Sequence, residues 1–311
     1  MVVCIGEILA DMIGSKENGV VRFNRYVGGA PFNVACDIKK LQGKAGFVGC
    51  VGEDLIGRFL SDYAENCGFD YWKVRKDGAH NTTLAFVELD AFGERKFSFY
   101  RKNTADYQIK EEDVLAAIEA ADIVHLGSLM LSEEAGRQIA DKIVEYTKKA
   151  GKVLSFDVNY RDDIFPSADV AVAIYKKYIE QADIVKFSED ELLLFAGETD
   201  LEKACKKLQK KDQLMLVTLG KEGSMAVLND VVCKEGSIPV KVVDTTGAGD
   251  AFYAGVLSRL DGVNLSKLTE SCLRKSLRYG NVCGALTTSG YGAVDACPDG
   301  KTVERILAEE K

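Results

Sequence analysis

The segment Val243–Gly255, which reads V-D-T-T-G-A-G-D-A-F-Y-A-G, combines residue types that can bind an anion and accept a proton. It follows the β-like run Ile238–Val243 and leads into apolar residues at helical spacing, so we expect a strand, a glycine turn and a helix. The N–H groups and the dipole at such a helix start favour a phosphate or another anion. Gly247 and Gly249 would let that ligand approach the backbone closely.

Asp250 falls in the first turn of this expected helix, where the dipole stabilises an ionised carboxylate. A carboxylate beside an anion site can take the proton of a hydroxyl that attacks phosphorus. An acidic residue after a glycine turn is also a common helix start, and Gly-x-Gly-Asp alone does not separate the two interpretations. The segment lacks the Gly-Lys-Ser/Thr of a P-loop, and Phe252 stands where the dinucleotide fingerprint requires glycine.

The whole segment resembles the C-terminal signature of the ribokinase-like (PfkB-type) sugar kinases. In that family the glycine turn forms the anion hole for the transferred phosphoryl group, and the Asp is the catalytic base. The resemblance implies these roles for Gly247, Ala248, Gly249 and Asp250. Near the other end of the chain, G-G-A-P-F-N-V-A (28–35) resembles the N-terminal signature of the same family.

Polar residues after predicted strands are candidates to hold a substrate. Asp11 follows the predicted strand Val2–Leu9, and Asn159 and Arg161 follow the predicted strand Lys152–Asp157. Ligands of open α/β sheets bind beyond the carboxyl ends of the strands, although each residue is equally compatible with a solvated loop. The resemblance adds further sugar-binding candidates: Gly28, Gly29, Asn33, Phe99 and Arg101. Phe99 is also compatible with a purely structural role.

The resemblance further implies ATP, Mg²⁺ and a monovalent cation, K⁺, as cofactors. The nucleotide-binding residues it implies are Lys186, Ser188, Thr218, Gly220, Gly223 and Asn281. The family has an Asn-x-x-Glu motif that organises Mg²⁺; here Ser188 replaces the Asn, and the retained Glu191 is expected to act through water, because Mg²⁺ gives up its waters reluctantly. The monovalent cation is expected near Asp244, Thr246, Thr287 and Gly292.

Strand-like and helix-like segments alternate from about Glu111 onward, whereas 12–27, 81–89 and 95–100 interrupt the alternation with β-like runs. We therefore expect an α/β fold with a mainly parallel sheet and a small separate β-sheet. The resemblance implies the three-layer α/β/α, ribokinase-like (Rossmann-like) type, in which the small sheet is a lid over the sugar. The expected main domain comprises 1–11, 32–80 and 106–311, and the lid comprises 12–31 and 81–105. In many members of the resembling family the lid also pairs with a second subunit, and a sheet this small cannot bury both its faces by itself, so a homodimer through the lid is expected.

Composition limits the remaining possibilities. The 311 residues are 47% hydrophobic and 28% charged, as in ordinary globular proteins, and the net charge of −8 argues against nucleic-acid binding. The nine cysteines include no C-x-x-C pair, which is typical of reduced thiols in a cytoplasmic protein. No apolar run approaches about 18 residues, so no membrane span is expected. With two histidines only, carboxylates must supply any acid–base chemistry.

The resulting prediction is an ATP-dependent sugar kinase, most similar to fructokinases in its Leu-Ala-Phe-Val (84–87) and Thr-Ala-Asp (104–106) segments. Kinases of 2-keto-3-deoxygluconate, which share the Gly-Glu-Arg (93–95) and Tyr-Arg (100–101) features, and kinases of aminoimidazole riboside are alternatives within the family. Arg101 and Arg161 are suited to hold the carboxylate of the keto-acid. A non-catalytic sugar-sensing relative and a dinucleotide-dependent oxidoreductase are alternatives of other classes. The intact Gly-Ala-Gly-Asp and the missing dinucleotide fingerprint argue against these two.

Overall fold

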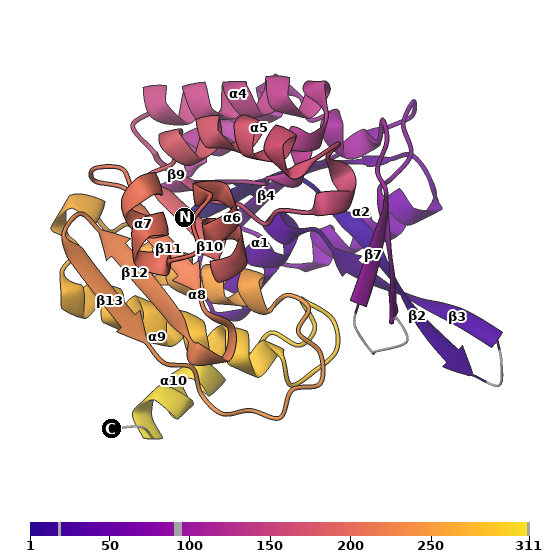
Figure 1. The fold of residues 1–311 in the computed structure, drawn as a ribbon. Helices are drawn as coiled ribbons and strands as arrows, with labels where there is room; N and C mark the ends of the chain where they lie inside the picture. Colours follow the sequence, from indigo (N-terminus) through magenta and orange to yellow (C-terminus); the bar gives the residue numbers. More distant parts are fainter. Residues whose placement is uncertain (18–19, 90–94, 310–311) are drawn as a thin grey trace.

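Two sheets organise the residues that the computed structural model describes, which are 1–17, 20–89 and 95–309 (Figure 1). The larger sheet is parallel except for the hairpin β12–β13 at one edge. Its strands, in order across the sheet, are β13 (Val231–Glu235), β12 (Ser224–Leu228), β11 (Leu214–Thr218), β10 (Ile184–Ser188), β9 (Val153–Asp157), β8 (Ile123–Leu126), β1 (Val2–Ile5), β4 (Ala45–Gly52) and β5 (Tyr71–Asp77).

Helices cover both faces of this sheet, because successive strand residues point to opposite sides. The helices are α1 (Ala30–Lys40), α2 (Leu55–Asn66), α3 (Glu111–Ala120), α4 (Glu134–Lys149), α5 (Ala168–Gln181), α6 (Glu189–Ala196), α7 (Leu201–Leu208), α8 (Ala248–Leu260), α9 (Glu270–Thr287) and α10 (Gly300–Glu309). In β1, Val3 and Ile5 face the layer formed by α3 to α7, while Val2 and Cys4 face the layer formed by α1, α2, α8, α9 and α10. The expected three-layer α/β/α fold is therefore confirmed.

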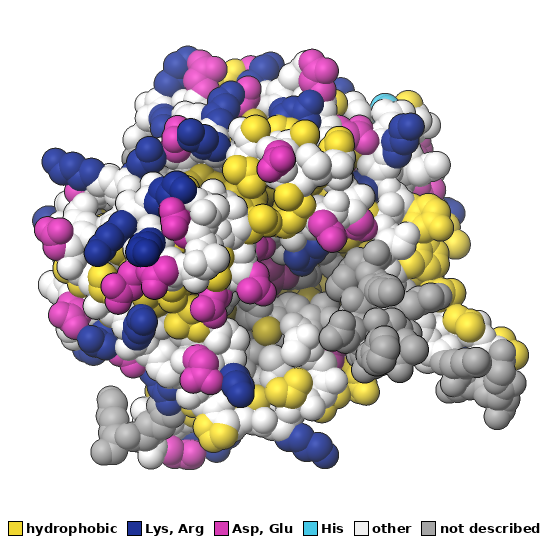
Figure 2. Space-filling model, viewed as in Figure 1, with side chains coloured by type: hydrophobic (Ala, Val, Ile, Leu, Met, Phe, Trp, Pro, Cys, Tyr) yellow, Lys and Arg dark blue, Asp and Glu magenta, His cyan; other side chains and the backbone are white. Residues whose placement is uncertain are grey.

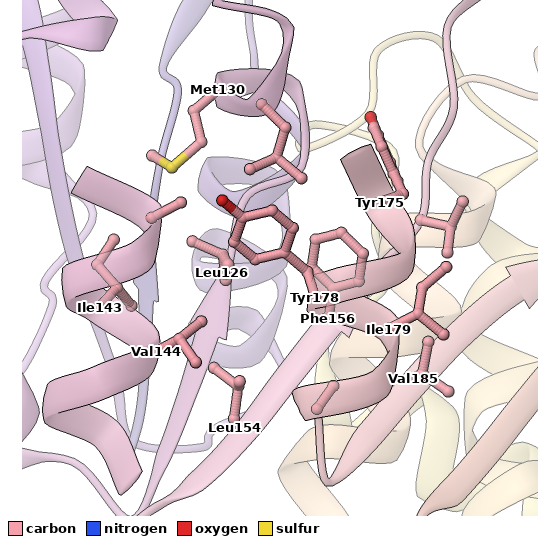
Figure 3. Close-up of a cluster of buried hydrophobic side chains, with 14 of the residues drawn as sticks. Leu126, Met130, Ile143, Val144, Leu154, Phe156, Tyr175, Tyr178, Ile179 and Val185 are labelled. Carbon is pink, nitrogen blue, oxygen red and sulfur yellow. The ribbon is translucent and has the colours of Figure 1, made fainter. Parts of the chain in front are cut away.

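Figure 3 shows part of the first of these two interfaces, where side chains of α4 and α5 pack on β8, β9 and β10. The aromatic ring of Phe156 on β9 lies edge-on to that of Tyr175 on α5, with ring centres 5.8 Å apart. Leu126 and Val185 extend the cluster along the neighbouring strands. This packing fixes the strand ends from which the polar residues project.

The smaller sheet has the strand order β3 (Val20–Gly28), β2 (Leu9–Glu17), β6 (Leu84–Leu89) and β7 (Arg95–Tyr100), and it extends from one side of the main body (Figure 1). Because β1 ends at Ile5 and β2 begins at Leu9, Asp11 lies within the smaller sheet, paired with Tyr26. The expectation that Asp11 follows a strand of the large sheet was wrong. A single apolar run hid the break between the two strands.

The expected strand Ile238–Val243 is also absent from the described structure. Its β-branched residues predicted a strand, but Val242 and Val243 are exposed and the segment joins neither sheet. Residues with high strand propensity form a strand only where another strand pairs with them, and no described strand pairs with this segment. Among the described residues, no helix combines the length and the apolar composition that a membrane crossing requires.

Candidate active site

Asp250 occupies the first turn of α8, and the glycine before that helix is structurally required. Gly247 adopts a left-handed conformation with φ of 77°, and a Cβ atom there would lie 2.5 Å from Ala293. The positive φ and the close contact both exclude a larger residue. The chain can therefore turn sharply into α8 and direct the first N–H groups of the helix toward one point.

The side-chain amide of Asn33 donates a 2.8 Å hydrogen bond to Oδ2 of Asp250. Asn33 lies on α1, which starts with Ala30 and Pro31 after Gly29 and runs to Lys40. The segments that resemble the N- and C-terminal family signatures thus meet at this hydrogen bond. Asn33 was predicted to contact a sugar; the structure shows that its amide also orients the carboxylate.

Burial raises the pKa of Asp250 to about 6, while the hydrogen bond from Asn33 and the charges of Lys186 and Arg161 act in the opposite direction. The sequence had suggested stabilisation of the carboxylate by the helix dipole, and the structure shows that desolvation prevails. At neutral pH the carboxylate is still largely ionised. A pKa just below neutrality suits a group that must accept a proton during a reaction.

Asp250 lines a cavity of about 360 Å³ between the main body and the smaller sheet, here called the Asp250 cavity. The surface in Figure 2 is hollowed beside this sheet, with charged side chains of both signs in the hollow. Most of the predicted substrate-binding residues line the cavity: Asp11, Gly29, Asn33, Phe99, Asn159 and Arg161. Leu9, Ala30, Leu129, Lys186, Thr245, Thr246, Gly247 and Gly249 complete the wall.

Gly28 does not line the Asp250 cavity but allows Asp11 to do so. A Cβ atom on Gly28 would lie 2.1 Å from Oδ2 of Asp11, on the neighbouring strand. Any larger residue at position 28 would therefore displace the carboxylate. The predicted substrate-binding role of Gly28 stays a prediction, and the structure shows only its effect on the position of Asp11.

Arg101, like Gly28, is a predicted substrate-binding residue that does not line the Asp250 cavity. Its guanidinium is buried and pairs with Asp106, and it also donates to the carbonyl oxygen of Leu129. Desolvating an arginine requires an acidic partner, and Asp106 supplies it. The prediction that Arg101 binds substrate is therefore corrected: it joins the end of β7 to the segment carrying Leu129.

Glu7 lies near Arg101 and was not identified from the sequence. Its side chain is fully buried, and neither carboxylate oxygen has a hydrogen-bond partner among the described residues. Burial raises the pKa of Glu7 to about 7, although the charge of Arg101 opposes this shift. Glu7 therefore carries a proton over much of the pH range in which a surface glutamate is ionised.

Lys186 and Asp157 form a second buried ion pair, directly at the Asp250 cavity. The ammonium nitrogen of Lys186 lies 2.8 and 2.9 Å from the two oxygens of Asp157, and it is 3.5 Å from the position of a Cβ atom on Gly249. Burial lowers the pKa of Lys186, but the charge of Asp157 outweighs it, so that the pKa is raised and the charge is retained. The two residues stand opposite each other on β9 and β10, a register that the sequence alone did not reveal.

A second cavity, of about 720 Å³, adjoins the first and is here called the Asn281 cavity. The two cavities share Thr245 and Gly249. Four predicted nucleotide-binding residues line it: Thr218, Gly220, Gly223 and Asn281. The sequence did not identify its apolar lining, which includes Ile238, Pro239, Val240, Val242 and Phe252. Lys186 lines the Asp250 cavity and not this one, and its contact with nucleotide phosphates stays a prediction.

Ser188 and Glu191 line neither cavity; together they cap α6. The Glu191 carboxylate accepts hydrogen bonds from the backbone N–H groups of Ser188 and Tyr160, both at 2.7 Å, and Ser188 Oγ accepts one from the N–H of Glu191. Both oxygens of Glu191 are thus engaged with the backbone. Because both oxygens already accept hydrogen bonds, Glu191 is better placed to contact a metal through a water molecule than to bind it directly.

Asp244, Thr246 and Gly292 meet beside the glycine turn. One oxygen of Asp244 accepts a 2.7 Å hydrogen bond from the N–H of Thr246, and the other lies 3.5 Å from the N–H of Gly292. The hydroxyl oxygen of Thr246 is buried without a hydrogen-bond partner among the described residues, and its predicted contact with a cation stays a prediction. The hydroxyl of Thr287 donates within its own helix, to the carbonyl of Cys283. Within the described ranges, no three His, Cys, Asp or Glu side chains converge as metal ligands would.

The arrangement combines a proton acceptor, an anion site and two adjoining cavities. One cavity is lined by polar groups suited to a polyol, and the other has an apolar wall suited to a nucleobase. The start of α8 lies where the two meet. This geometry allows a hydroxyl held in the first cavity to attack a phosphoryl group extending from the second.

Comparison with known proteins agrees with this geometry. Residues 1–299 match the pfkB family of carbohydrate kinases. The chain is 39% identical over 315 residues to the probable fructokinase-6, chloroplastic, of Arabidopsis thaliana, covering 98% of this chain and 82% of that protein. It is 37% identical to fructokinase-1 of Zea mays, covering 99% and 97% of the two chains.

Solved structures give the same result. A fructokinase from Xylella fastidiosa with bound ATP superposes with a TM-score of 0.91 at 30% identity, covering 99% of this chain and 98% of that one. A double-mutant fructokinase from Vibrio cholerae O395, with bound fructose, ADP and potassium ion, gives 0.89 at 30% identity and coverage of 98% and 97%. An aminoimidazole riboside kinase from Salmonella enterica, complexed with aminoimidazole riboside and an ATP analogue, gives 0.82 at 25% identity and covers 99% of both chains.

Proposed function

The chain belongs to the pfkB family of carbohydrate kinases, which are phosphotransferases with an alcohol group as acceptor, and we propose that it is a fructokinase. It would transfer the γ-phosphoryl group of ATP to the 6-hydroxyl of D-fructose. The observation that carries this proposal is the position of Asp250, which lines one cavity and stands next to Gly249, a residue common to both cavities.

In the proposed reaction, fructose occupies the Asp250 cavity. Asp11, Asn159 and Arg161 are placed around it to hydrogen-bond its hydroxyl groups. Asn33 holds the carboxylate of Asp250 in one orientation, and that carboxylate accepts the proton as the sugar hydroxyl attacks phosphorus. Phe99, on a strand of the smaller sheet, lines the cavity too, so that this sheet helps to exclude water as a competing acceptor.

ATP is proposed to occupy the Asn281 cavity, with its base against the apolar wall and its phosphates toward Gly220 and Gly223. The N–H groups of Gly247 to Gly249 would stabilise the charge on the transferred group, an effect worth about 3 kcal/mol per donor. Lys186 adds a positive charge on the same side. Mg²⁺, when bound with the nucleotide, neutralises phosphate charge. Glu191 would orient its waters, and K⁺ would lie beside Asp244 and Thr246.

A homodimer through the smaller sheet is part of the proposal. On its face away from the Asp250 cavity, Phe86 contacts the rings of both Phe23 and Tyr100, with centres 5.1 and 5.2 Å apart. Tyr100 is 64% and Phe23 is 37% exposed, and Figure 2 shows hydrophobic side chains along this sheet. An exposed aromatic row is more stable when a second copy covers it.

A cytoplasmic location is proposed from the nine free thiols.

The test is ATP-dependent release of ADP with fructose, 2-keto-3-deoxygluconate, aminoimidazole riboside and ribose, with Mg²⁺ and K⁺ present. We expect the highest kcat/KM with fructose. Turnover with only the keto-acid would keep the mechanism and make Arg161 a carboxylate-binding residue. Turnover with none of the four sugars would contradict the proposal and favour a non-catalytic sugar-sensing relative.

A further inference from the structure

The sulfur atoms of Cys36 and Cys67 lie 3.5 Å apart, although the two residues belong to different helices. Cys36 is buried in α1, and Cys67 is the partly exposed residue that ends α2. A disulfide has its sulfur atoms about 2.05 Å apart. A movement of roughly 1.5 Å, shared between side-chain rotation and a small shift of one helix, would join them.

The two thiols differ in the way that a reactive pair requires. The hydrogen bond with Cys36 and, next, the charge of Lys40 lower the pKa of Cys67, although partial burial opposes them. Burial, first, and the neighbouring Cys67 and Asp37 raise the pKa of Cys36. Cys67 is thus the accessible thiol that forms a thiolate more readily, and Cys36 is the protonated thiol behind it.

We propose that Cys36 and Cys67 form an oxidation-sensitive dithiol, which hydrogen peroxide converts to a disulfide. The Cys67 thiolate attacks one peroxide oxygen, the O–O bond breaks, and the departing hydroxide takes a proton to become water. The Cys36 sulfur then attacks the resulting sulfenic acid, an S–S bond forms, and a second water leaves. Two thiols and one peroxide give one disulfide and two waters.

The disulfide would affect the active site by displacing α1. Asn33 lies one helical turn before Cys36, and its amide holds Asp250. Drawing α1 toward the end of α2 displaces that amide, so that the oxidised protein should phosphorylate sugar more slowly. This consequence rests on the proposed function, whereas formation of the disulfide does not.

The experiment uses the full chain with Cys272→Ser, because Cys272 is exposed and hydrogen bonds from Thr269 lower its pKa. This variant has eight of the nine cysteines. After peroxide treatment and denaturation, we expect six titratable thiols, a mass lower by about 2 Da, and a peptide joining Cys36 to Cys67. Dithiothreitol should restore all eight.

Two further variants identify the order of reaction. Adding Cys67→Ser should leave all seven remaining thiols unreacted. Adding Cys36→Ser instead should trap a sulfenic acid on Cys67 that dimedone labels, and Cys36→Ala serves the same purpose if the serine variant folds poorly. Eight surviving thiols, or a disulfide between other cysteines, would overturn the proposal.

Activity is measured in parallel, and we expect at least a fivefold fall in kcat that tracks the disulfide and reverses with dithiothreitol. A disulfide with unchanged kcat would overturn the link to Asp250. Absence of kinase activity in the reduced protein would count against the proposed function only. The thiol titration would still test the disulfide, because it does not depend on turnover.

Discussion

The amide of Asn33 and the carboxylate of Asp250 are joined by a 2.8 Å hydrogen bond between the first turns of α1 and α8. The bond joins the two signature segments, whose helices also pack against each other in one core cluster. It fixes the carboxylate on the side of the cavity where the sugar hydroxyl is expected. It also helps to keep a buried carboxylate ionised, because it lowers a pKa that burial raises.

Asp250→Asn should lower kcat at least about a hundredfold, because the variant cannot accept the hydroxyl proton. The same change should raise the thermal midpoint at pH 8, since it removes a buried charge whose pKa burial raises to about 6. Turnover is measured by ADP release, and unfolding by circular dichroism. Unchanged turnover would contradict the role of Asp250 as base.

Asn33→Leu should shift the acid limb of the pH–kcat/KM profile upward. Asp250 acts in its ionised form, so activity falls as pH drops through its pKa of about 6. Removing the hydrogen bond from Asn33 raises that pKa further, and the half-maximal pH rises with it. Leucine preserves the side-chain volume. A lower activity with an unshifted profile would show that Asn33 only positions substrate.

Glu7→Gln should change how stability depends on pH. The pKa of Glu7 is 4.5 in an unperturbed chain and about 7 in the folded protein, so between these values the folded state retains a proton that the unfolded state has released. The free energy of unfolding of the parent protein therefore falls as pH rises across this interval. The variant does not lose stability in this way. Between pH 5 and pH 8 its free energy of unfolding should therefore rise, relative to that of the parent protein, by on the order of 3 kcal/mol.

Urea unfolding at pH 5 and pH 8 measures this difference. Glu65→Gln, at an exposed position on α2, is the matched control and should follow the parent protein at both pH values. A Glu7→Gln variant that tracks the parent would mean that Glu7 titrates as an ordinary surface carboxylate.

Arg101→Met should destabilise the protein by about 3–5 kcal/mol, because it leaves Asp106 buried without its partner. Arg305→Met removes an arginine from the exposed pair with Glu309 and should cost no more than about 1 kcal/mol. Denaturant midpoints give both values. If the two substitutions lower the free energy of unfolding equally, the Arg101–Asp106 pair does not stabilise the fold, and substrate binding by Arg101 becomes the better interpretation.

Gly247→Ala should reduce kcat at least about tenfold, since a displaced turn costs the stabilisation that its N–H groups supply. Gly262→Ala is the control, because Gly262 also has a positive φ, of 72°, but has nothing within 4 Å of an added Cβ. It should cost about 1–2 kcal/mol of stability without affecting turnover. Equal losses of kcat in both variants would mean that the contact with Ala293 is unimportant.

The features of the fold that depend on local sequence patterns could be predicted from the sequence. The glycine turn before Asp250 predicted the start of α8, and the alternation of strands and helices predicted the α/β fold. Sequence reasoning missed what depends on neighbours in space. Asp11 lies in a different sheet from the one expected, and the β-branched run before Asp244 pairs with no strand of the described structure.

Burial accounts for the other differences in the site. The sequence does not show that Asp157 and Lys186 stand opposite each other on adjacent strands, or that Asp106 engages Arg101. The pKa of Asp250 follows from desolvation, which no spacing of residues reveals. Predictions from sequence are therefore least accurate for charged residues, because the partners of such a residue in the folded protein decide whether it has a structural or a ligand-binding role.

Thr245 and Gly249 belong to the walls of both cavities. An acceptor and a donor that share a wall can be present together, and the phosphoryl group needs no intermediate carrier on the protein. Initial rates measured against one substrate at several fixed concentrations of the other should therefore give intersecting double-reciprocal lines. A sequential kinetic mechanism would thus follow from the positions of Thr245, in the turn before α8, and Gly249, in its first turn.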